Sequence, residues 1–145
     1  MQFFAVLPIV LVLTSSAVFA QSNHIYADVQ VTDIAPNSDF IWQRKNQHTP
    51  KYPVELARSG TRGCAVLSFD ISASGRTENI EIINSVPNKL VGRYSRQMLQ
   101  KWQWVSTAAA AMPEKRTLRL DFCIGGESLA QSVQACKQQA QLACG

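Results

Sequence analysis

The sequence predicts an α+β fold: a three-stranded antiparallel sheet with one packed amphipathic helix, plus a C-terminal helix. Two segments with strand-like alternation, residues 64–71 and 77–84, are joined by a short turn that contains Gly75. A helical apolar stripe follows over residues 90–102, and a third alternating segment covers residues 116–124. This order of elements indicates a small sheet covered by a helix.

The N-terminus is typical of an export signal. Residues 3–20 form an apolar run without charge, and Val18 and Ala20 fit a signal-peptidase site. We therefore expect a signal peptide over residues 1–20. The alternative is an uncleaved membrane anchor, because the run approaches the roughly 20 residues that span a bilayer. Pro8 and the absence of Lys or Arg before the run favour cleavage.

Composition excludes several functional classes. The net charge is +4, and the basic residues are scattered, so no nucleic-acid partner is expected. His24 and His48 are the two histidines, and no Cys-x-x-Cys pair occurs, so no metal site and no cofactor are predicted. No Ser-His-Asp, Cys-His or glycine-rich phosphate pattern stands out, and the chain is not expected to be an enzyme.

The elements follow from local patterns. Residues 25–34 alternate loosely and predict a peripheral strand within an N-terminal extension, residues 21–46. Pro53 can open a short helix, which Gly60 ends. Asn88 can cap the amphipathic helix. A cysteine-bearing helical tail is expected over residues 126–145.

The strands have two distinct faces. In the first, Ala65, Leu67, Phe69 and Ile71 share one face, opposite Cys64. The third strand has two sets of side chains: Leu118, Leu120, Phe122 and Ile124 face inward, and Thr117, Arg119, Asp121 and Cys123 face outward. A right-handed crossover that skips one position makes the first strand central and antiparallel to the third.

Four cysteines after an export signal predict two disulfides. The antiparallel arrangement brings the start of the first strand beside the end of the third, so we expect a bond between Cys64 and Cys123. Cys136 then pairs with Cys144. An unbroken helix would separate these two by about 12 Å, beyond disulfide reach. Either the last helix ends before Cys144 or the pairing differs.

A family resemblance is carried by Pro50-Lys51-Tyr52-Pro53, Ala57, Gly60, Gly63, the strand at 64–71, Gly75, Ser85 and Lys101-Trp102-Gln103-Trp104. With these residues in this order, residues 47–125 resemble the TonB C-terminal domain. TonB proteins couple the inner-membrane proton-motive force to outer-membrane receptors. Their C-terminal domain binds a receptor segment as a strand added to an exposed sheet edge.

The resemblance implies that the third strand is the docking edge and that the Lys51-Tyr52-Pro53 segment lies near it. The implied partner-binding residues are Lys51, Tyr52, Pro53, Arg116, Leu118, Arg119, Leu120, Asp121 and Phe122. The implied partner is an outer-membrane receptor or another periplasmic protein, and a homodimer is also considered. The expected location is the periplasm.

The chain departs from the energy transducers because it has no proline-rich rod and because its leader looks cleavable. We therefore expect a stand-alone periplasmic member of the family. An uncleaved leader would instead favour a membrane-anchored energy transducer. A docking edge filled by the chain's own terminal segments would favour a secreted, disulfide-stabilised structural or inhibitory protein that shares the fold.

Overall fold

The computed structural model describes residues 24–34 and 39–145. The expected signal peptide, residues 1–20, lies outside the described residues. Within the described part of the chain, no helix is long and apolar enough to cross a membrane.

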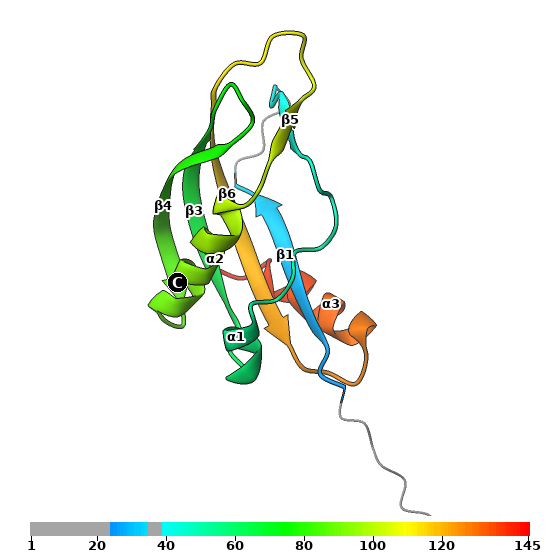
Figure 1. The fold of residues 1–145 in the computed structure, drawn as a ribbon. Helices are drawn as coiled ribbons and strands as arrows, with labels where there is room; N and C mark the ends of the chain where they lie inside the picture. Colours follow the sequence, from blue (N-terminus) through cyan, green and yellow to red (C-terminus); the bar gives the residue numbers. More distant parts are fainter. Residues whose placement is uncertain (1–23, 35–38) are drawn as a thin grey trace, which may run out of the picture.

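A four-stranded antiparallel sheet forms the centre of the fold, in the order β1-β6-β3-β4 (Figure 1). Its strands are β1 (Ala27–Asp33), β3 (Gly63–Ile71), β4 (Thr77–Val86) and β6 (Glu114–Ile124). The predicted α+β fold is confirmed, and β3 lies between β4 and β6 as the crossover argument required. The sheet has four strands because the predicted peripheral strand, β1, joins it beside β6.

Helices cover both faces of the sheet. On one face lie α1 (Val54–Arg58) and α2 (Lys89–Gln100), and on the other lies α3 (Leu129–Gln139) (Figure 1). The side chain of Asn88 caps α2 by accepting a hydrogen bond from the backbone N–H of Leu90 at 2.9 Å. The apolar core lies beneath α1 and α2, and its largest fully buried members are Phe69, Phe122, Leu56, Leu67, Ile71, Leu99, Leu118, Leu120 and Val91.

A second, two-stranded sheet joins β2 (Trp42–Arg44) and β5 (Trp104–Ser106). Sequence patterns predicted a loop after residue 103, because three residues are too few to show alternation. The indole of Trp42 donates to the carbonyl of Met112 at 2.8 Å, and the indole of Trp104 donates to the hydroxyl of Thr77 at 2.8 Å. These bonds fix the small sheet against the end of the large one.

All four cysteines form disulfides, but the predicted pairing is wrong. Cys64 bonds to Cys144, and Cys123 bonds to Cys136. Cys64 lies opposite Asp121 in the ladder between β3 and β6, so Cys123 lies too far along β6 to reach it. Because α3 ends at residue 139, the tail can turn back across the sheet to Cys64.

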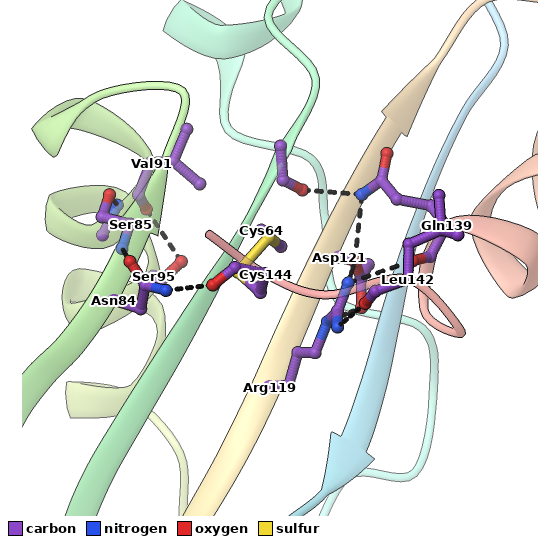
Figure 2. Close-up of a disulfide and its surroundings, with 12 residues drawn as sticks. Cys64, Asn84, Ser85, Val91, Ser95, Arg119, Asp121, Gln139, Leu142 and Cys144 are labelled. Atoms are coloured by element: carbon purple, nitrogen blue, oxygen red, sulfur yellow. Dashed lines mark hydrogen bonds and ion pairs between the residues drawn. A yellow bond between two sulfur atoms is a disulfide. The ribbon is translucent and has the colours of Figure 1, made fainter.

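The tail, here the residues that follow α3 (140–145), covers a buried ion pair (Figure 2). Arg119 donates two hydrogen bonds to the carboxylate of Asp121, each 2.8 Å long, and Asp121 is fully buried. The same guanidinium donates to the carbonyls of Gln139 and Leu142. The sequence predicted correctly that both side chains point away from the apolar core, but α3 and the tail enclose that face.

Candidate partner-binding surfaces

The edge of β6 that was expected to receive a partner is already filled by β1. The seven residues of β1 pair with β6 in continuous antiparallel register, from Ala27 opposite Ile124 to Asp33 opposite Leu118. The expectation of a bare edge on the third strand is therefore wrong. The alternation of residues 25–34 correctly predicted a strand, but it did not indicate which strand of the sheet this one would pair with.

The predicted binding residues of β6 are all buried. Leu118, Leu120 and Phe122 belong to the apolar core. Arg119 and Asp121 lie under the tail.

Arg116, the sixth of these residues, is also enclosed. It is buried, and its guanidinium lies 4.0 Å from the ring centroid of Phe40 and 5.4 Å from that of Trp104. Its Nε lies 3.5 Å from a carboxylate oxygen of Glu114, in an ion pair that lacks hydrogen-bond geometry. None of the six side chains is therefore accessible to a segment of a partner protein.

The outer edge of β1 is shielded at its middle. The N–H of Gly125 donates to the carbonyl of Tyr26, and the N–H of Ile34 donates to the carbonyl of Thr117. The backbone groups of Tyr26 and Ile34, which flank the two ends of β1, therefore face β6. Because bonding alternates along an antiparallel ladder, the backbone groups of Ala27, Val29, Val31 and Asp33 face away from β6. Val29 is only 3% exposed, so a strand added here would meet packed atoms at its centre.

The opposite edge of the sheet, on β4, is irregular. Its pairing with β3 shifts register twice, and Asn79 has a positive φ of 50°. Glu78 and Glu81 are exposed along it. Bulges and charges of this kind are how natural sheets discourage edge pairing. Neither edge of the sheet therefore offers a regular, open strand.

An open groove lies elsewhere, between residues 44–55 and the C-terminal half of α2. We call it the α2 groove. Its volume is about 1340 Å³, and the Lys51-Tyr52-Pro53 segment lines it. The ring of Tyr52 packs edge-on against Phe122 with centroids 5.6 Å apart, so the segment does lie near β6, as the family resemblance implied.

Tyr52 holds its wall of the groove in place. Its hydroxyl donates to the carbonyl of Thr61 at 2.5 Å. Burial raises the pKa of this phenol to about 12, while the charge of Arg62 acts in the opposite direction. The side chain is therefore a neutral hydrogen-bond donor at physiological pH. Pro50 and Pro53 restrict the backbone on either side of it.

The other wall of the groove is an aromatic surface formed by α2 and the residues that directly follow it. Tyr94, Met98 and Trp102 line it and are partly buried. The guanidinium of Arg44 lies 4.5 Å from the ring centroid of Trp102, and burial lowers the pKa of Arg44. The sequence predicted that this apolar stripe packs against the sheet. The apolar stripe is wider than the part of it that contacts the sheet. Its outer side, with Tyr94, Met98 and Trp102, therefore remains partly exposed.

The rim of the groove is basic. Arg44, Lys45, Lys51 and Lys101 line it, against one acidic residue, Glu55. Among the residues that the structure describes, no ion pair involves any of these five side chains. The sequence did not reveal this basic rim, because its cations are far apart along the chain. They converge only when residues 44–55 fold back onto α2.

The comparisons with known proteins identify the family of this chain. The family model of the Gram-negative bacterial TonB protein C-terminal matches residues 48–123, which is just over half of the chain. The chain belongs to the TonB C-terminal family. The match includes the Lys51-Tyr52-Pro53 wall, α2 and most of β6, whereas β1 and α3 lie outside it.

Curated relatives of this TonB-family chain are themselves TonB proteins. It is 30% identical over 60 residues to Protein TonB of Yersinia enterocolitica and 33% identical over 55 residues to that of Pseudomonas aeruginosa. These alignments cover 41% and 38% of the chain, but only 24% and 16% of the relatives. The chain thus spans about a quarter or less of the relatives' length.

A solved structure was also matched, the solution NMR structure of the Pseudomonas aeruginosa TonB C-terminal domain. The TM-score is 0.48 at 23% identity, covering 63% of this chain and 92% of that one.

Proposed function

We propose that this chain is a periplasmic protein-binding module of the TonB family that binds an extended segment of a partner, such as an outer-membrane receptor, in the α2 groove. The proposal depends on one observation: only part of the binding site that the family resemblance implied is accessible to a partner. Lys51, Tyr52 and Pro53 line an open groove, while the implied residues of β6 are buried.

The shape of the groove suits an extended segment. Sites for small ligands typically enclose about 300–1,000 Å³. At about 1340 Å³, the α2 groove has room for several residues of a peptide. Its walls also carry side-chain amides, from Asn46, Gln47, Gln97 and Gln103, that can bond the backbone of an incoming chain.

Strand addition to β6 is the second mode open to this family. Here it requires β1 to leave, because β1 occupies the bonding groups of β6 that face outward. Departure of β1 would uncover Val29 and Asp28, which are 3% and 5% exposed. The groove is open without any such rearrangement, and this difference favours it as the first contact.

The proposed location follows from the disulfides. Disulfides form and persist mainly in oxidising compartments, and the periplasm is one. The second candidate function is a secreted structural or inhibitory protein. The filled edge of β6 favours it, because that edge is the surface by which strand addition would occur.

The test is a titration of the oxidised protein with receptor-derived extended peptides, followed by calorimetry and amide chemical shifts. Binding in the groove shifts the amides of Tyr52, Tyr94 and Trp102. Gln97→Trp fills the groove from α2 and should weaken binding at least tenfold. Gln100→Trp is the matched control, since Gln100 is exposed on the same helix but does not line the groove.

A second pair of variants separates the two binding modes. Thr32 and Asp33 are both exposed. Thr32→Pro removes an N–H that bonds to β6, whereas Asp33→Pro removes one that faces away. Tighter peptide binding by Thr32→Pro alone, with shifts along β6, would establish strand addition instead. If no receptor-derived peptide shifts any amide, the structural candidate takes its place.

A further inference from the structure

We infer that the α2 groove selects acidic segments that carry an aromatic or large apolar residue. This inference rests on the proposed function, because it names the chemistry of the segment that the groove would take. It is carried by two features that lie side by side: a partly buried aromatic wall and a rim of cations that form no ion pair within the described residues.

The aromatic wall supplies an anchor site. Trp102 packs edge-on against Trp104, with ring centroids 6.0 Å apart, and Arg44 covers part of its face. Met98 lies beside it in the same wall. A rigid indole next to a flexible thioether accommodates apolar side chains of different shapes. One large side chain of the partner would complete the burial of this surface.

The rim supplies the charge selection. Four cations against one carboxylate leave a formal charge of +3 around one opening. Lys45, Lys51 and Lys101 are exposed and carry no ion pair within the described part of the chain. Clustered like charges raise the local concentration of oppositely charged partners and speed their association. An acidic segment would relieve the repulsion among these side chains.

The chemistry of the groove favours a peptide over a lipid or glycan surface. The cations surround a concave site rather than one flat face, so a bilayer would meet only the rim. The amides of Asn46 and Gln97 match the alternating donors and acceptors of a peptide backbone. The backbone bond from Lys45 to Gln103, 2.8 Å long, fixes the entrance in position.

The experiment uses three synthetic peptides of one extended design, in which Phe is flanked by Glu, by Gln or by Lys. We expect the Glu peptide to bind at least tenfold more tightly than the Lys peptide, with the Gln peptide between them. A change in tryptophan emission reports occupancy of the groove, because Trp102 lines it whereas Trp42 and Trp104 are buried elsewhere. The preference should shrink as salt is added.

Charge-reversal variants test whether the lysines of the groove cause the preference for the acidic peptide. Lys45→Glu, Lys51→Glu and Lys101→Glu together should abolish or invert the preference. The matched control carries Lys89→Glu, Lys115→Glu and Lys137→Glu, since these lysines are exposed and lie outside the groove. Both triple variants change the net charge equally, so equal losses would mean nonspecific attraction and overturn the inference.

The remaining outcomes are also decisive. If the three peptides bind alike, the acidic preference is wrong and the peptide-binding function stands. If none binds, the proposed function fails. If vesicles of anionic lipid bind and the groove variant alone loses that binding while no peptide binds, the occupant is a membrane surface and the peptide assignment is overturned.

Discussion

Cys64 lies opposite Asp121 in the antiparallel ladder between β3 and β6. From this position it carries the disulfide to Cys144 across the face on which Asp121 binds Arg119 (Figure 2). Besides a hydrogen bond from the side-chain amide of Asn84 to the carbonyl of Cys144, two further connections hold the tail over the buried ion pair. One is the disulfide, and the other is the set of bonds from Arg119 to the carbonyls of residues 139 and 142.

Non-reducing proteolysis and mass spectrometry should recover peptides that link Cys64 to Cys144 and Cys123 to Cys136. The chain-entropy relation gives about 4.5 kcal/mol for the first bond and about 3 kcal/mol for the second, because the bonds close loops of different length. Replacing both members of the first pair by Ser should therefore lower the free energy of unfolding more than replacing the second pair. Recovery of a peptide that joins Cys64 to Cys123 would contradict the register.

Asp121→Ala should be strongly destabilising, by roughly 3–5 kcal/mol, because it leaves the buried guanidinium of Arg119 without its carboxylate. Denaturant unfolding measures the loss. The control is Glu78→Ala, which breaks an exposed pair with Arg76 that is 3.9 Å long. That change should cost less than about 1 kcal/mol. Similar losses in the two variants would mean that burial of the Arg119 pair contributes nothing.

Tyr52 should make stability fall at alkaline pH. Burial raises the pKa of its phenol from 10.0 to about 12 in the folded protein. Between these values the unfolded chain releases the proton and the folded chain keeps it, so the free energy of unfolding decreases as pH rises. Tyr52→Phe has no phenol and therefore lacks this pH dependence. Its stability relative to the parent should rise from pH 10 to pH 12, and the phenolate absorbance difference should show a midpoint near 12.

Gly75 closes the turn between β3 and β4 with a φ of 78°, and a Cβ there would lie 2.3 Å from the carbonyl oxygen of Trp104. Gly75→Ala should therefore add a steric clash to the conformational cost of about 1–2 kcal/mol. Gly60 has a φ of 62° and open space around it, so Gly60→Ala isolates the conformational part. Thermal unfolding should rank Gly75→Ala as the less stable variant. Equal losses would show that the start of β5, at Trp104, can move away from residue 75.

Local patterns were sufficient to predict several elements: the two faces of β3 and β6, the cap at Asn88 and the apolar stripe of α2. Each depends on neighbours a few residues apart, so the sequence displays it directly. The same patterns recovered the family, because Pro50-Lys51-Tyr52-Pro53 and the Gly and Trp positions are themselves local. They also predicted β1 as a peripheral strand.

The pairing of distant segments was decided only by the tertiary structure. Alternation assigns a residue to a face, and a slip of two residues leaves every side chain on the same face. Parity therefore could not distinguish Cys123 from Asp121 as the neighbour of Cys64. For the same reason it could not show that β1 fills the edge of β6, or that scattered cations converge on the α2 groove, since these contacts join residues that only the packed chain brings together.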